Sequence, residues 1–120
     1  MSTALALSNL HLAVSDVDRA ARFYVGVFGL EERYRADDGV VYLRIPGSRS
    51  HVALRYHSDA ADRASRFGFA TDTADTDSIV RRALSLGGSL VRRRDLGAGL
   101  VEVLVADPDG NVISLSAAGS

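Results

Sequence analysis

Apolar and polar positions follow two different periods along this chain, and these periods predict its secondary structure. Residues 10–14 alternate as a half-buried strand does, whereas residues 17–28 place apolar side chains at helical spacing. Ser15 stands where a helix N-cap would, with Asp18 three residues on, and Gly29 stands where the helix should end. Three further alternating runs follow, separated by turn residues: 31–35, 40–45 and 51–56. The first half therefore predicts the order β-α-β-β-β.

The second half repeats this order after a polar, alanine-rich connector at 57–64. A strand at 66–70 and a capping region at 73–77 precede an apolar helical stripe that ends at the pair of glycines 87–88. Three more strands are expected at 89–94, 100–105 and 111–116, with a turn at 107–110 before the last. We therefore expect one α+β domain over residues 1–120, built from two βαβββ modules (about 5–57 and 65–118) that form a curved mixed sheet around a cavity, with helices on the outer face.

Strand alternation separates an apolar face, expected to pack under the helices, from a mixed face. The apolar face comprises Leu10, Leu12, Val14, Val41, Leu43, Ile45, Val52, Leu54, Tyr56, Phe67, Phe69, Val101, Val103, Val105, Ile113 and Leu115. The mixed face comprises Asn9, His11, Ala13, Tyr42, Arg44, His51, Ala53, Arg55, Arg66, Gly68, Ala70, Leu100, Glu102, Leu104, Ser114 and Ser116. Small residues near its strand centres leave room for a ligand, so this face is the candidate site.

Composition narrows the function classes. At 120 residues, 47% hydrophobic and 24% charged, the chain is an ordinary globular domain. A net charge of -1 argues against nucleic acid as a partner. The absence of cysteine excludes disulfides and thiolate chemistry, and all fourteen basic residues are arginine, which excludes a lysine Schiff base. We see no signal peptide and no membrane-spanning run, so a cytoplasmic protein without membrane contact is expected.

Three stretches together resemble the vicinal-oxygen-chelate superfamily, which includes glyoxalases, bleomycin-resistance proteins and extradiol dioxygenases. The opening stretch is Leu10-His11-Leu12-Ala13-Val14 with Asp16, Phe23-Tyr24 and Phe28-Gly29-Leu30; the second is Val40-Val41-Tyr42-Leu43-Arg44; the third is Asp107-Pro108-Asp109-Gly110-Asn111 followed by Val112-Ile113-Ser114-Leu115. Each motif alone is weak, but they cover nearly the whole chain in the right order. The resemblance implies a ligand-binding domain that dimerises, and the connector at 57–64 is long enough for the modules to swap between chains.

The resemblance also implies a metal site with one ligand from each of the first, fourth, fifth and eighth strands. His11 matches the first position, but the others fall on Ala53, Arg66 and Ser114, which are poor or impossible ligands. We therefore expect a member without a metal or other cofactor. A rearranged site of His11, His51 and Glu102 is the alternative.

Several residues of the mixed face have both a functional and a structural interpretation. His11 is a candidate base or ligand-orienting residue, or a histidine satisfied by a neighbour. Glu102 is a candidate acid or base, or the ion-pair partner of an arginine at 44, 55 or 66. Arg66 would bind an anionic ligand or reach solvent, and Tyr42 would stack on an aromatic ligand or fill space. The expected ligand-binding set is Tyr42, Arg44, His51, Ala53, Arg55, Arg66 and Ser114.

Two function hypotheses stay open at this stage. The first is a protein that binds a small aromatic or polyketide-like molecule without metal, for sequestration, antibiotic resistance or natural-product metabolism. The second is a metal-free isomerase, cyclase or dehydratase that uses His11, Arg66 and Glu102. A metal-dependent dioxygenase or lyase is disfavoured by the missing ligands, and the sequence does not separate binding protein from enzyme.

Overall fold

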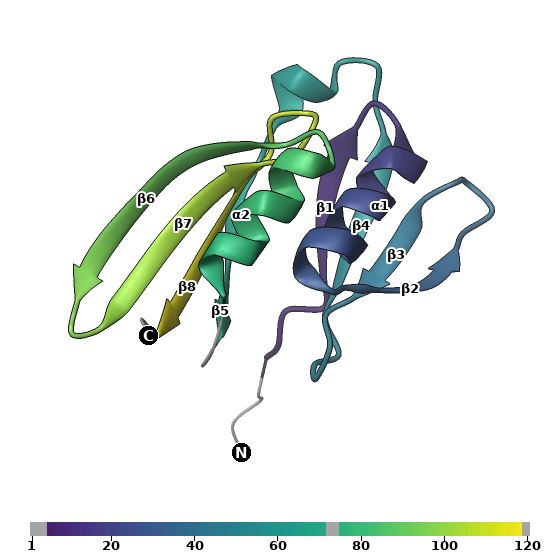
Figure 1. The fold of residues 1–120 in the computed structure, drawn as a ribbon. Coiled ribbons are helices and arrows are strands. Elements are labelled where there is room, and N and C mark those ends of the chain that lie inside the picture. The colour runs from purple at the N-terminus through teal and green to yellow at the C-terminus, as the bar shows by residue number, and fades with distance from the viewer. Residues whose placement is uncertain (1–4, 72–74, 119–120) are drawn as a thin grey trace.

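The structure, a computed structural model, describes residues 5–71 and 75–118 (Figure 1). The first half contains β1 (Asn9–Val14), α1 (Val17–Phe28), β2 (Glu31–Arg35), β3 (Val41–Arg44) and β4 (His51–Tyr56). A short 3-10 helix, η1 (Ala60–Arg63), lies in the connector. The second half contains β5 (Arg66–Thr71), α2 (Thr76–Ser85), β6 (Ser89–Gly97), β7 (Leu100–Ala106) and β8 (Val112–Ala118). The predicted order of elements is confirmed in both halves.

Each half forms a four-stranded mixed sheet of its own. The strand orders are β1-β4-β3-β2 and β5-β8-β7-β6, and in each sheet the first strand runs parallel to the last strand of its module. The connection between these two strands contains the helix and the two other strands of the module, which gives the long crossover that a parallel pair requires. The α+β class and the two βαβββ modules are therefore confirmed. The strands form two mixed sheets, one in each module, where the sequence analysis expected a single curved sheet.

Helix α1 has the predicted bounds, but its N-cap lies one residue later than the sequence predicted. Asp16, not Ser15, is the N-cap, and its side chain accepts a hydrogen bond from the Arg19 backbone N–H at 3.0 Å. Ser15 is instead drawn to the other module, where its hydroxyl donates to Asp109 at 2.6 Å. The predicted end is confirmed: Gly29 adopts a left-handed conformation with a φ of 73° and its N–H meets the last carbonyls of the helix.

The two helices lie side by side with a sheet on either flank (Figure 1). The predicted apolar face packs against them in one core, whose fully buried members include Leu12, Leu43, Leu54, Val103 and Ile113. Tyr56 is the exception: it was assigned to this face but is 65% exposed, because β4 ends there beyond the cover of α1. No helix within residues 5–71 and 75–118 is long and apolar enough to cross a membrane.

A buried polar network joins the two halves. The Tyr24 hydroxyl on α1 donates to Asp107 Oδ2 at 2.6 Å, and the Asn111 side chain donates to the same oxygen and to the Ala13 carbonyl. The Asn111 amide oxygen also accepts from the Ser65 backbone N–H. Because buried polar groups destabilise a fold unless they are paired, this network fixes how the second module sits on the first.

Candidate functional site

The face of the first sheet that turns away from the helices carries most of the predicted site. In the register of this sheet His11 on β1 lies beside Ala53 on β4, and Ala53 lies beside Tyr42 on β3. Alternation then places the neighbouring site residues on the same face: Arg44, His51 and Arg55. The structure therefore brings six predicted residues onto one surface, here called the open face.

Ala53 lies at the centre of this open face. It is fully buried although it points away from the core, because its neighbours His11, Tyr42, His51 and Arg55 are all larger and close over it. The expectation that small residues leave room for a ligand above the strands stays a prediction.

His11 on β1 and Arg55 on β4 form the polar side of the open face. Arg55 Nε donates to His11 Nδ1 at 3.1 Å, so the neutral imidazole carries its proton on Nε2. The Arg55 guanidinium also lies 4.0 Å from the Asp38 carboxylate. His11 is exposed, and its remaining ring nitrogen is a hydrogen-bond donor toward solvent or a ligand.

Aromatic rings on β2 and β3 form the opposite side of the open face. Tyr34 and Tyr42 stack with ring centroids 4.7 Å apart and planes 12° from parallel, and His51 meets Tyr42 edge-on at 6.4 Å. Tyr34 was missed by the sequence analysis because β2 contains a register shift between Glu32 and Tyr34, which alternation alone cannot reveal. The useful signal would have been the short β2–β3 hairpin, which sets Tyr34 opposite Tyr42.

Arg44 contributes less free charge to the open face than the sequence suggested. Its Nη2 atom pairs with Glu31 Oε1 at 3.0 Å, a cross-strand contact between β3 and β2. Such half-exposed pairs contribute little to stability. Arg44 therefore borders the aromatic side as part of an ion pair.

Glu102 lies on the outward face of the second sheet, away from His11. Its partner is Arg94 on β6, at 2.7 Å, rather than Arg44, Arg55 or Arg66 as the sequence suggested. The β6–β7 register places Arg94 directly opposite Glu102, so the hairpin decides the pairing. The 92–94 arginine run lies on an exposed edge strand.

The parallel ladders show which positions correspond in the two modules. The Ser8 carbonyl accepts from the His51 N–H, and the Ser65 carbonyl accepts from the Val112 N–H, both at 2.9 Å. Counting from these bonds, His11 corresponds to Gly68, and its neighbour Ala53 corresponds to Ser114. The fifth-strand counterpart of His11 is therefore Gly68, which lies two residues after the expected Arg66 on the same face of β5. A Cβ at Gly68 would collide with Ser114 Oγ.

These four positions do not suit a divalent metal ion. His11 offers one imidazole nitrogen and Ser114 a neutral hydroxyl, while Ala53 and Gly68 offer no side-chain donor. In the described residues, no three His, Asp or Glu side chains gather closely enough to hold a metal ion, and this includes the alternative set of His11, His51 and Glu102.

Comparisons with known proteins agree with this architecture. The family model of the glyoxalase/bleomycin resistance protein/dioxygenase superfamily matches residues 6–115, so the chain belongs to that family. No curated protein matches the chain closely in sequence. The family assignment rests on nearly the full length of the domain.

Solved structures show the same fold at low sequence identity. Lactoylglutathione lyase from Agrobacterium tumefaciens is 23% identical with a TM-score of 0.73, covering 96% of this chain and 95% of its own. TioX from Micromonospora sp. ML1 is 22% identical with a TM-score of 0.72, covering 94% and 98%. A glyoxalase/bleomycin resistance protein/dioxygenase family enzyme from Burkholderia phytofirmans PsJN is 20% identical with a TM-score of 0.75, covering 95% and 99%. These neighbours include a lyase, so the fold alone does not choose a function.

Proposed function

We propose that this protein binds a small, planar aromatic or polyketide-like molecule on the open face of its first sheet, without a metal ion. The stacked pair of Tyr34 and Tyr42 on the open face carries the proposal. Two parallel rings offer a stacking surface that a flat molecule can extend. Sequestration of such a molecule is the corresponding biological role.

Polar groups on the β1–β4 side of the open face supply orientation. Nε2 of His11 presents a donor, and Arg55, which hydrogen-bonds to Nδ1, holds the ring in place. Ligand sites combine apolar contacts with a few fixed polar groups. A carbonyl or phenolate oxygen on the ligand suits this side of the open face.

Binding of an anthraquinone sulfonate, followed by calorimetry, tests the proposal. Tyr42→Ala should weaken binding about tenfold, since an aromatic pair contributes about 0.5–1.5 kcal/mol beyond its buried area. Tyr56→Ala is the matched control, because Tyr56 is exposed at the end of β4. Chelator should leave the affinity unchanged. Equal effects of the two variants, or loss of binding with chelator, would refute the proposal.

A metal-free enzyme is the alternative function. It would need His11, Arg66 and Glu102 around one substrate, yet His11 lies in the first sheet and the other two in the second. Glu102 is also engaged with Arg94. Recovery of a cognate ligand chemically unchanged after incubation would favour binding, whereas a product that disappears in His11→Ala would favour catalysis.

We also propose that the protein is a homodimer that protects its exposed edge strands. Within one chain the outward faces of both sheets lie away from the helices, and the edge strands β2 and β6 are exposed. Such edges are commonly protected by association. Light scattering at micromolar concentration should give twice the mass of the chain, and a monomer would contradict the proposal.

A further inference from the structure

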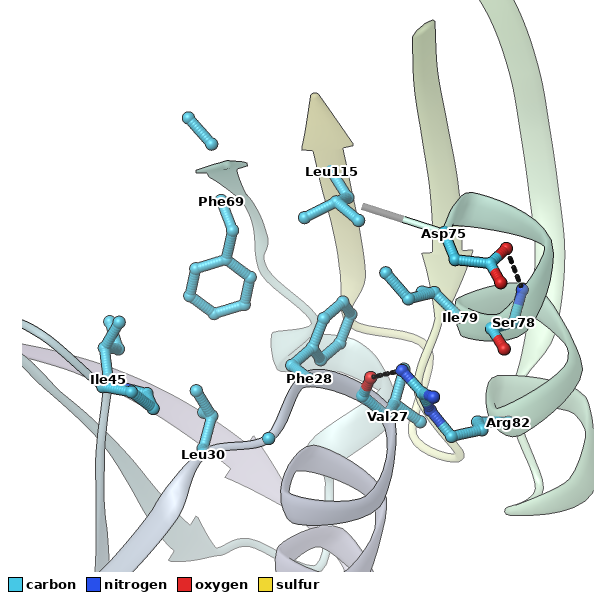
Figure 2. A pocket seen from close by; sticks show the side chains of 13 residues that line it. Val27, Phe28, Leu30, Ile45, Phe69, Asp75, Ser78, Ile79, Arg82 and Leu115 are labelled. Carbon is cyan, nitrogen blue, oxygen red and sulfur yellow. Dashed lines mark hydrogen bonds between the residues drawn. The ribbon is translucent and has the colours of Figure 1, made fainter. Parts of the chain in front are cut away.

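A groove of about 490 Å³ opens between the two modules where α1 ends and α2 begins (Figure 2). It lies on the helix side of the sheets, so it is neither the open face nor the cavity expected from the sequence. Its apolar wall includes Phe28 from α1, Phe69 from β5, Leu115 from β8, and Leu30 and Ile45 from the first module. Its volume falls within the range of ligand pockets, about 300–1,000 Å³.

One face of α2 supplies the polar edge of this groove. Asp75, Ser78, Ile79 and Arg82 follow at helical spacing, so they project on the same side of the helix, as Figure 2 shows. The Asp75 carboxylate is engaged as the N-cap, because it accepts from the Ser78 backbone N–H at 3.1 Å. The Asp75 carboxylate is therefore already engaged in capping α2.

Arg82 is held at the groove but keeps most of its hydrogen-bonding capacity. Its Nη2 atom donates to the Val27 carbonyl at the end of α1, at 3.1 Å (Figure 2). A guanidinium carries five N–H donors, and within residues 5–71 and 75–118 Arg82 has no carboxylate partner. A cation fixed beside an apolar wall, without a carboxylate partner among the described residues, favours a carboxylate on an apolar body.

We propose that this groove binds an aliphatic carboxylic acid, with its carboxylate on Arg82 and its chain lying against Phe28 and Phe69. The two rings contact each other, with centroids 5.2 Å apart, and together form an apolar wall of the groove that comes from both modules. A ligand there would contact both modules at once. This site shares no residue with the aromatic site on the open face, so each proposal can fail without the other.

Titration calorimetry with dodecanoate tests the assignment, with dodecanol and dodecylamine as probes of the head group. Dodecanoate should bind once per chain and more tightly than the other two. Arg82→Gln should weaken dodecanoate about tenfold or more and leave dodecanol unchanged, because a hydrogen bond to a charged group is lost. Ser78→Phe should block both dodecanoate and dodecanol by filling the groove.

Matched controls separate the groove from general effects. Arg81→Gln and Ser85→Phe alter the same helix outside the groove, and Tyr42→Ala alters the open face; all three should bind dodecanoate like the parent protein. Four outcomes would overturn the proposal: no dodecanoate binding, equal weakening by the two arginine variants, loss of binding in Tyr42→Ala, or tighter binding of dodecylamine that Asp75→Asn abolishes.

Discussion

Replacing Tyr24 by Phe should destabilise the protein at neutral pH and remove part of its sensitivity to alkali. The Tyr24 hydroxyl donates to Asp107 Oδ2 at 2.6 Å across the two modules. Phe keeps the ring in the core and deletes this bond, while Asp107 retains three donors from Asp109 N–H and the backbone and side chain of Asn111. The loss should be about 1.5–3 kcal/mol, as for hydrogen bonds to charged groups.

The alkaline effect follows from the ionisation of Tyr24. Burial raises the pKa of Tyr24 far above its ordinary value, and the negative charge of Asp107 and the hydrogen bond to it raise the pKa further. Below pH 10 the hydroxyl is protonated in both the folded and the unfolded chain, so its contribution to stability is complete. Above pH 10 only the unfolded chain releases the proton, so stability falls. The loss is about 1 kcal/mol between pH 10 and 11, then about 1.4 kcal/mol per unit.

The composition of the chain makes this effect measurable. There is no lysine and no cysteine, so tyrosine is the only side chain type that ionises between about pH 9 and 12. Urea unfolding at pH 8, 10 and 11 should show the gap between the parent protein and Tyr24→Phe narrowing by about 1.4 kcal/mol. Tyr56→Phe, at an exposed tyrosine, should show no such narrowing. A gap that stays constant from pH 8 to 11 would refute the assignment of the proton to Tyr24.

Leu54→Ala should cost about 2–5 kcal/mol, because Leu54 is fully buried in the core and truncation leaves a cavity. His11→Ala should change stability by no more than about 0.5 kcal/mol, and the reverse order in urea unfolding would mean that the two faces are exchanged. Gly68→Ala should destabilise the second sheet because its Cβ meets Ser114 Oγ, and Ser114→Ala should recover much of the loss; additive effects in a double-mutant cycle would contradict this contact. Elemental analysis of the purified protein should find no stoichiometric divalent metal, and one chelator-resistant Mn, Fe, Ni or Zn per chain would overturn the metal-free proposal.

Local periodicity was sufficient to predict the elements, their order and the buried face. Those features depend on neighbours within one helix or strand, and the burial of Leu12, Leu54 and Val103 follows directly from alternation. The N-cap of α1 was harder, because Ser15 and Asp16 both carry suitable oxygens. Asp109, which lies 94 residues from Ser15, binds its side chain and backbone N–H and leaves the cap to Asp16.

The candidate site was predictable by face but not by partner. Tyr42, His51 and Arg55 lie on the open face as expected, yet the stack with Tyr34 depends on a register shift in β2. The partner of Glu102 depends on the register of the β6–β7 hairpin. The inter-module groove is lined by the ends of elements from both halves, so no single stretch of the sequence predicts it.

The polar network around Asp107 also imposes an order on biosynthesis. Its bonds to Tyr24, Ser15 and Ala13 span 83, 94 and 98 residues of chain. A nascent chain emerges from its N-terminus, so α1 must wait for nearly the whole polypeptide before its hydroxyl finds an acceptor. Meanwhile all strand pairs of the first module lie within residues 9–56. We therefore expect docking of the two halves to be completed only after residues 107–111 have emerged, and a chain that ends before residue 107 lacks the polar contacts that fix the first module to the second.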